Sequence, residues 1–245
     1  MLIVNADDWG MNKKATDTIL KLYKMGCITS ATAMVFMKDT ERSANLAISN
    51  RINTGLHLNF TMKYETTGTN KLSKLFDYQM QIAGFLLKNK YYRLIYNPFL
   101  RKQFDYVFKA QFEEYLRVFD KPPTHIDGHR HMHLCMNVIL DKLIPTGCKI
   151  RRNFSFSSED GVGFINRFSR KVVDSLLMRN YKSTDYFFSL APIDKGRIRK
   201  IIEKAKKLNV ELMVHPVRSE EYEYLTKSDY KELIEKVQKG TYSIL

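Results

Sequence analysis

The sequence contains little cysteine, proline or glycine. Its three cysteines, Cys27, Cys135 and Cys148, form no Cys-x-x-Cys pair. A sparse, odd cysteine count argues against a disulfide framework and is typical of a reducing compartment, and a structural zinc site would usually need paired cysteines. With 11 glycines and six prolines among 245 residues, the chain has no low-complexity tract, and its composition is that of a folded globular protein.

Long apolar runs are absent as well. No run approaches the roughly 18 apolar residues of a membrane-spanning helix. Met1 leads directly into an apolar segment, without a basic region before it, so we expect no signal peptide. The expected location is cytoplasmic, and a peripheral position at the inner membrane surface is left open. No glycine-rich phosphate loop follows the first apolar segment, which argues against nucleotide binding.

Acidic residues are the minority charge. The chain has 40 Lys and Arg against 26 Asp and Glu, which gives a formal net charge of +14. Such a charge indicates anionic surroundings, whether nucleic acid, acidic glycan or a lipid surface, although a basic surface without a specific partner is an equally good interpretation. Because no RNA- or DNA-binding motif is evident, we expect no nucleic-acid partner.

Strand-like and helix-like segments alternate along the whole chain. This alternation predicts a parallel sheet, and about seven strands favour a barrel over an open sheet. We therefore predict an α/β fold with a single, incomplete (β/α) barrel domain over residues 1–245. Residues 76–119 are mostly helical, with a break near Asn97-Pro98, and are predicted to be a helical insertion. The expected strands cover residues 2–5, 30–36, 53–59, 124–127, 148–151, 186–189 and 210–215.

The histidines are clustered. Four of the six lie in one short string, whose candidate residues are His125, Asp127, His129, His131 and His133. In an extended segment residues two apart share a face, so an extended stretch would crowd these side chains together. Neutral imidazole is a common metal ligand, but one metal with an open position cannot use all four, so some would contact substrate or support the ligands. A surface polyhistidine patch is the alternative.

The remaining candidates also follow predicted strands, namely Asp7 and Asp8, His57, Arg151 and Arg152, and His215. Parallel α/β folds place their chemistry at the carboxyl ends of the strands. Two neighbouring carboxylates can divide the work, because one can face a cation while the other accepts a proton. The alternatives are an ordinary turn for the aspartates, hydrogen-bonded core positions for the histidines, and a solvated basic pair for the arginines, which otherwise orient Asp7 or bind substrate.

Four short strings, NADDWG, TGLHLNF, THIDGHRHMH and ELMVHP, resemble in their order and spacing the YdjC-like carbohydrate deacetylases, the family of chitooligosaccharide deacetylase. The resemblance runs from Leu2 to about Pro216. It implies an incomplete (β/α) barrel related to the polysaccharide deacetylases, and hydrolysis of an N-acetyl group from a sugar. By this resemblance the metal ligands are Asp8, His57 and His129, the general base is Asp7, the general acid is His215, and His125 supports the site.

The sequence thus predicts a metal-dependent N-deacetylase that acts on an N-acetylated carbohydrate, with Asp127, His131, Arg151 and Arg152 as substrate-binding or supporting groups. One divalent metal is expected, magnesium or zinc first, with manganese and cobalt left open, because two imidazoles and one carboxylate do not choose among them. An acidic glycan or a lipid-linked sugar as partner, and a homodimer, are left open. The alternatives are a metal-dependent phosphoesterase or nuclease, and a basic glycan- or nucleic-acid-binding module with a structural metal.

One further segment is chemically biased. Residues 78–104 contain no acidic residue, several interleaved aromatics, and the cations Lys88, Lys90, Arg93, Arg101 and Lys102. One interpretation is a pair of helices that pack their aromatics on the barrel and keep their cations in water. The other is a binding surface, either for an acidic glycan whose rings stack on the aromatics or for lipid headgroups.

Overall fold

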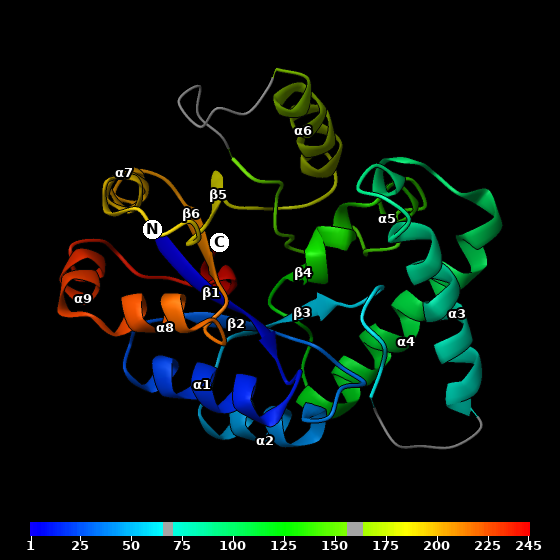
Figure 1. The fold of residues 1–245 in the computed structure, drawn as a ribbon, viewed down its shortest axis with the longest axis horizontal. Helices are drawn as coiled ribbons and strands as arrows, with labels where there is room; N and C mark the ends of the chain where they lie inside the picture. Colours follow the sequence, from blue (N-terminus) through cyan, green and yellow to red (C-terminus); the bar gives the residue numbers. More distant parts are fainter. Residues whose placement is uncertain (66–70, 156–163) are drawn as a thin grey trace.

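The computed structural model describes residues 1–65, 71–155 and 164–245, which form one α/β domain around a curled parallel sheet (Figure 1). Within these residues six strands are hydrogen-bonded in the order β4-β3-β2-β1-β6-β5, and every neighbouring pair is parallel. The predicted α/β fold with an incomplete barrel is confirmed. The strands are β1 Leu2–Trp9, β2 Ser30–Ala33, β3 Thr54–Leu58, β4 Ile126–Gly128, β5 Tyr186–Ser189 and β6 Val210–Val214.

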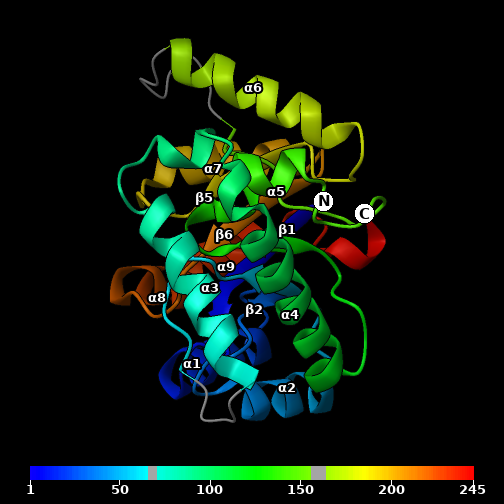
Figure 2. The ribbon, with the colours of Figure 1, turned by 90° about the vertical axis from the view of Figure 1, so that its right-hand side faces the viewer.

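Helices surround the sheet, with α1 and α2 on one side and the long pair α3 and α4 on another (Figures 1 and 2). The α-helices of the described residues are α1 Lys13–Lys24, α2 Thr40–Ser49, α3 Lys71–Leu86, α4 Arg101–Phe119, α5 Met136–Leu140, α6 Phe164–Met178, α7 Lys195–Ala205, α8 Ser219–Thr226 and α9 Ser228–Glu235. Within the same described residues there are four short 3-10 helices, η1 Tyr92–Leu94, η2 Pro98–Leu100, η3 His129–Leu134 and η5 Tyr242–Ile244. Among these described helices, none combines the length and the apolar character that crossing a bilayer requires.

Strand β1 lies in the middle of the sheet, between β2 and β6, and all of its residues are buried. Its first residues, Leu2, Ile3 and Val4, are continuously apolar, as expected for a parallel strand that is covered on both faces. Just beyond β1, Asn12 caps α1 by accepting a hydrogen bond from the Ala15 N–H at 2.9 Å. The cap fixes where the strand gives way to the helix, and so positions the aspartates at the end of β1.

The chain between β3 and β4 forms the helical segment predicted over residues 76–119, although α3 already begins at Lys71. Helices α3 and α4 pack against each other, and η1 and η2 connect them. The connection is fixed to α5 by two hydrogen bonds between Asn97 and Asn137, at 3.0 and 2.8 Å. The connection between α3 and α4 is therefore held beside α5, the helix that follows the histidine cluster.

The strand predicted over residues 148–151 is present only as isolated bridges. Ile150 pairs with Ile126 of β4, and Lys149 pairs with Lys182, which lies just before β5. The Ile150 N–H donates to the Lys182 carbonyl at 2.9 Å, and the Arg151 N–H donates to the Ile126 carbonyl at 3.0 Å. This part of the chain therefore bridges the two outer strands of the sheet without forming a full strand, because only these few residues find backbone partners on both sides.

Candidate metal centre

Asp7 and Asp8 reach the same site because β1 is irregular at its end. Successive side chains of a regular strand point to opposite faces. Here Asp8 has a φ of 68°, and the pairing of β1 with β2 shifts register between Ala6 and Trp9. A left-handed backbone at a non-glycine residue costs on the order of 1–3 kcal/mol and is often found at functional sites. The bulge turns both carboxylates toward the carboxyl ends of the strands.

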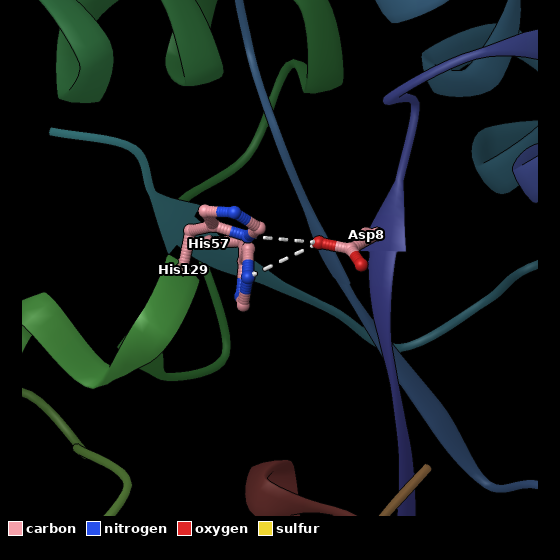
Figure 3. A group of neighbouring side chains, drawn as sticks. All are labelled: Asp8, His57 and His129. Carbon is pink, nitrogen blue, oxygen red and sulfur yellow. Dashed lines mark hydrogen bonds and ion pairs between the residues drawn. The ribbon is translucent and has the colours of Figure 1, made fainter. Parts of the chain in front are cut away.

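Asp8 faces two imidazoles from different parts of the chain (Figure 3). Its Oδ1 lies 3.4 Å from Nε2 of His57, on β3, and 3.3 Å from Nδ1 of His129, the first residue of η3. The potential ligand atoms of these three residues all lie within 4.8 Å of one another. One carboxylate and two imidazoles form a donor set that suits a divalent metal and leaves positions open for other ligands.

Asp127 sets the orientation of the His57 ring. The Nδ1–H of His57 donates to Asp127 Oδ1 at 2.7 Å, which leaves the Nε2 lone pair facing Asp8. A carboxylate behind a histidine in this way is a common support for a metal ligand. The two nitrogens that face Asp8 stand farther from it than the roughly 2.7–2.9 Å of a charged hydrogen bond. When neither nitrogen carries a proton, their lone pairs and Asp8 Oδ1 are spaced so that a cation fits between them.

The electrostatics keep Asp8 ionised. Burial opposes its charge, but when the ring nitrogens that face Asp8 carry a proton, His129 and His57 donate hydrogen bonds that outweigh burial and hold the pKa of Asp8 below its usual value. Burial likewise opposes a charge on His57, yet Asp127 and Asp8 raise the pKa of His57 well above its usual value. The carboxylates around His57 therefore attract positive charge, which either a proton or a metal can supply.

A buried guanidinium, that of Arg151, joins three carboxylates beneath this site. Its Nη2 and Nη1 donate to Asp7 Oδ1 and Oδ2 at 2.7 and 2.8 Å. Its Nη1 also lies 2.6 Å from Asp127 Oδ2, and its Nε donates to Glu211 Oε1 at 2.8 Å. The ligand atoms of Asp7, His57 and Asp127 also converge, but here the cationic position beside both carboxylates is already filled by Arg151.

The two carboxylate oxygens of Asp7 differ in their hydrogen-bond partners, and Oδ2 has fewer than Oδ1. Oδ1 accepts from Arg151 and, at 3.1 Å, from Asn5 Nδ2. Oδ2 accepts from Arg151 and lies 3.8 Å from Nε2 of His215. Burial opposes the charge on Asp7, but Arg151 and the neighbouring histidines hold its pKa below the usual range. Asp7 is therefore an ionised carboxylate whose Oδ2 accepts fewer hydrogen bonds than its Oδ1.

His215 directly follows β6, and its Nε2 faces Asp7 Oδ2 at 3.8 Å. Its backbone N–H donates to Glu221 Oε2 at 2.6 Å, and this contact fixes the chain where Pro216 ends the strand. The side chain is 21% exposed, whereas that of Asp7 is 3% exposed. His215 therefore lies between the buried carboxylate and solvent, where a substrate would approach.

An extended stretch that would crowd the histidines together does not run through residues 125–133, because the extended chain ends with β4 at Gly128. Arg130 and His131 have φ values of 54° and 58°, so the chain coils into η3 and sends its histidines in different directions. His131 packs edge-on against Phe154, with ring centroids 4.6 Å apart, and His133 Nε2 lies 3.1 Å from the Arg151 carbonyl. Neither belongs to the group around Asp8, in which His129 alone represents this stretch.

His125 is packed between Tyr242 and β3. Its ring stacks on Tyr242 with centroids 3.8 Å apart, and its pKa falls to about 3 because it is buried. On the other side it lies against Gly55, where an added Cβ would come within 2.6 Å of the ring. Glycine at this position of β3 is thus required by the packing of His125, two residues before the ligand position of His57.

Arg152 does not share the position of Arg151. Its Nη2 donates to Asp174 Oδ2 at 2.8 Å, and its Nη1 donates to the backbone carbonyls of Thr184 and Asp185. The expectation that either arginine could orient Asp7 is therefore corrected: Arg151 makes that contact, and Arg152 faces away from it. Successive residues of an extended chain point in opposite directions, which explains the division.

Glu211 and Tyr242 are part of this network and were not among the sequence candidates. Glu211 Oε2 accepts from the Tyr242 hydroxyl at 2.5 Å, and its other oxygen accepts from Arg151. A signal for Glu211 existed, because it is the one charge in the apolar strand Val210–Val214. The sequence around Tyr242 carries no comparable signal.

A model of the family described as YdjC-like protein matches residues 1–236. The chain belongs to the YdjC-like protein family. The match includes every strand of the sheet and all the residues of the site described above except Tyr242.

Several curated relatives of this family member have names that refer to sugars. A carbohydrate deacetylase of Clostridium beijerinckii is 35% identical over 133 residues, 54% of this chain and 50% of the relative. A chitooligosaccharide deacetylase of Yersinia enterocolitica is 30% identical over 135 residues, 55% of this chain and 51% of the relative. The chain thus spans about half the length of these two relatives. A chitooligosaccharide deacetylase of Yersinia pestis is 27% identical over 225 residues, 88% of this chain and 81% of the relative.

A solved structure shares the fold. A protein of Enterococcus faecalis V583, provisionally assigned to cellobiose-phosphate cleavage, superposes with a TM-score of 0.72 at 20% sequence identity. The superposition covers 99% of this chain and 97% of that protein. At this identity the likeness establishes the architecture alone.

Proposed function

We propose that this protein is a metal-dependent deacetylase that hydrolyses the N-acetyl group of an N-acetylated carbohydrate. The observation that carries the proposal is the pairing of two groups within one site. Asp8, His57 and His129 form a donor set for a divalent cation. Beside it stands Asp7, a buried carboxylate fixed by Arg151 and facing His215. The deacetylase names of the relatives support the choice of an acetylated sugar as substrate.

The metal ion would be held by Asp8 Oδ1, His57 Nε2 and His129 Nδ1. When bound, a divalent ion supplies Lewis acidity, which polarises the acetyl carbonyl and lowers the pKa of a water molecule. Asp127 keeps the His57 lone pair directed at this position through the 2.7 Å hydrogen bond to Nδ1. The donor set is compatible with magnesium, zinc, manganese or cobalt.

Asp7 is proposed as the general base. Its Oδ2 accepts a proton from the attacking water, because Oδ2 accepts a hydrogen bond from Arg151 alone, whereas Oδ1 also accepts one from Asn5. Arg151 keeps the carboxylate in one orientation and, through its charge, keeps it ionised before the reaction. His215 is proposed as the general acid, which gives a proton to the departing amine. Its Nε2 lies 3.8 Å from Asp7 Oδ2, so both groups address the same small volume.

The first test is a comparison of products. The metal-free protein would be loaded separately with magnesium, zinc, manganese or cobalt and incubated with N-acetylated oligosaccharides, and acetate release would be measured. Phosphate release from phosphate esters would be measured in parallel. We expect acetate release with at least one metal and none without. Phosphate release without acetate release would instead identify the protein as a metal-dependent phosphoesterase.

The second test concerns the acid. His215→Ala should slow turnover because the amine would leave without its proton, and the rate penalty should shrink on an acetylated substrate with a better leaving group. Metal content should be unchanged, since His215 is outside the Asp8 group. An equal penalty on both substrates would remove His215 from the acid role without affecting the assignment of the reaction.

A further inference from the structure

Residues 87–102, which connect α3 to α4, expose large apolar side chains. Phe99 is 88% exposed and Tyr91 is 60% exposed, and Leu87, Leu94 and Ile95 are also exposed. Single exposed apolar residues are ordinary on a protein surface. Here five occur within residues 87–99, and exposed apolar side chains that gather in one segment often mark a binding surface.

The other side of this segment packs against the rest of the protein. The exposed side chains are the ones that take no part in this packing. The ring of Tyr92 meets that of Phe85 edge-on, with centroids 5.1 Å apart. The Tyr96 hydroxyl donates to Asp141 Oδ1 at 3.0 Å. Together with the hydrogen bonds between Asn97 and Asn137, these contacts hold the segment in a defined position. The packing interpretation therefore accounts for the inner side chains and not for the outer ones.

Cations accompany the exposed apolar groups. Lys88 and Lys90 are exposed, and their ammonium groups lie over the rings of Tyr92 and Tyr91 at 5.7 and 5.1 Å. Arg93 extends the positive charge toward α6, because after burial its charge is the next largest cause that lowers the pKa of Arg170. No acidic residue occurs between Tyr78 and Phe104 to balance these charges.

We propose that residues 87–102 form a docking surface for a membrane that contains anionic lipids. Lys88, Lys90 and Arg93 meet the headgroups, while Phe99 and Ile95 enter the boundary between headgroups and acyl chains. An acidic glycan fits less well, because sugar rings stack on flat aromatic faces and gain little from exposed leucine and isoleucine side chains. This surface goes beyond the proposed deacetylation and does not depend on it.

The docking surface also has a defined relation to the metal centre. It is joined through Asn137 to α5, which directly follows η3, and His129 is the first residue of η3. In both ribbon views the connection between α3 and α4 lies beside α5 and below α6 (Figures 1 and 2). A membrane held there would lie near the carboxyl ends of the strands, where a sugar carried on a lipid would be presented to the site.

The proposal is tested with vesicles of phosphatidylcholine, with and without phosphatidylglycerol. The purified full-length protein should sediment with the anionic vesicles at low salt and detach as salt is raised, because the screening length falls from about 10 Å at 0.1 M to about 3 Å at 1 M. The triple variant Lys88→Glu/Lys90→Glu/Arg93→Glu should bind roughly 100-fold more weakly, since each cation near an anionic surface contributes about fivefold or more.

A matched control variant separates the effect of this surface on binding from the effect of the net charge. Lys14, Lys24 and Lys236 are exposed residues of α1 and of the turn after α9, and changing all three to Glu alters the net charge by the same amount. This control should keep most of the binding. Equal losses in the two triple variants would overturn the proposal, as would a wild-type protein that does not bind anionic vesicles at low salt. Binding to an acidic polysaccharide but not to vesicles would assign the surface to a glycan instead.

Insertion of the apolar side chains has its own measurement. The chain has a single tryptophan, Trp9, which is fully buried, so Phe99→Trp adds one exposed fluorophore. Its emission should shift to the blue on anionic vesicles and be quenched by lipids brominated on their acyl chains. Phe99→Ala should weaken binding even at higher salt. An unquenched, unshifted tryptophan at this position in vesicle-bound protein would contradict the proposed face.

Discussion

The hydroxyl of Tyr242 donates to Glu211 at 2.5 Å, while the other oxygen of Glu211 accepts from the Arg151 guanidinium at 2.8 Å. Arg151 in turn makes two hydrogen bonds to Asp7. A residue close to the end of the described chain is thus joined to the proposed general base through one carboxylate and one guanidinium. Glu211 is thus a third carboxylate partner of Arg151, in addition to Asp7 and Asp127.

Tyr242→Phe should change the pH dependence of turnover rather than metal binding. The phenyl ring can still stack on His125, but Glu211 loses a hydrogen bond that lowers its pKa. Burial already raises the pKa of Glu211, so in the variant it should take up a proton at higher pH. Arg151 would then draw more strongly on Asp7 and weaken it as a base. We expect the acidic limb of the kcat profile to move to higher pH, with metal content unchanged.

Tyr230→Phe is the matched control for this variant. Tyr230 is also fully buried, and its hydroxyl donates to the Cys27 carbonyl at 3.1 Å, far from any carboxylate of the site. Both variants should lose stability by about 1–3 kcal/mol. If the two pH profiles shift equally, Tyr242 is a structural residue only.

Metal content should depend on the Asp8 group and not on the other histidines of the cluster. Asp8→Asn and His129→Ala should lose the metal, as measured by elemental analysis after dialysis, because each removes a proposed ligand. Asp127→Asn should weaken metal binding by about 10- to 100-fold, since it releases the ring of His57. His131→Gln should retain the metal. Full occupancy in His129→Ala would disprove the ligand assignment.

Asp7→Asn separates proton transfer from metal binding. The amide cannot accept the proton of water, so turnover should fall by about 10²- to 10⁴-fold. The metal should remain, because the Asp8 group is intact. Arg151 keeps Asp127 and Glu211 as partners, so the fold should survive, which circular dichroism would verify. Turnover near that of the wild type would exclude Asp7 as the base.

His125 should make the folded state sensitive to acid. Its pKa is about 3 in the folded protein because of burial, against about 6.5 in an unfolded chain. Below pH 6.5 the unfolded chain therefore binds a proton that the folded chain does not, and stability should fall by up to about 1.4 kcal/mol per pH unit as the pH decreases. Urea unfolding at several pH values should give a smaller slope for His125→Gln than for the wild type. Identical slopes would mean that other groups dominate the acid response.

The sequence predicted the fold, and it placed the candidate site residues at one edge of the sheet, because both inferences rest on local patterns. Alternating apolar segments predict a parallel sheet, and polar residues after those segments predict an active edge. Asp8, His57 and His129 come together for this reason, since Asp8 and His57 lie near the carboxyl ends of β1 and β3 and His129 directly follows β4. The helix Ser219–Thr226 was missed, because its short length and its polar residues, such as Glu220 and Glu221, gave no clear apolar face.

What the sequence did not predict depends on backbone exceptions and on distant contacts. The left-handed conformations of Arg130 and His131 break the two-residue periodicity on which the crowded histidine face was based. The separation of Arg151 from Arg152 depends on which side of the segment faces the barrel. The contact between Tyr242 and Glu211 joins residues 31 positions apart, and no pattern in the sequence fixes how the last turn approaches β6.

The isolated bridges near Ile150 are the part of the barrel wall that we expect to open most easily. Strands inside the sheet are joined by ladders of consecutive pairs. The seam formed by Lys149 and Ile150 is instead joined by one pair with Lys182 and one pair with Ile126. Local opening costs least free energy where the fewest hydrogen bonds break. The amide hydrogen of Ile150 should therefore exchange with deuterium sooner than the amide hydrogens that join β1 to β6. Because Arg151 adjoins the seam, each opening also loosens its hold on Asp7, and a ligand that fills the site should slow this exchange.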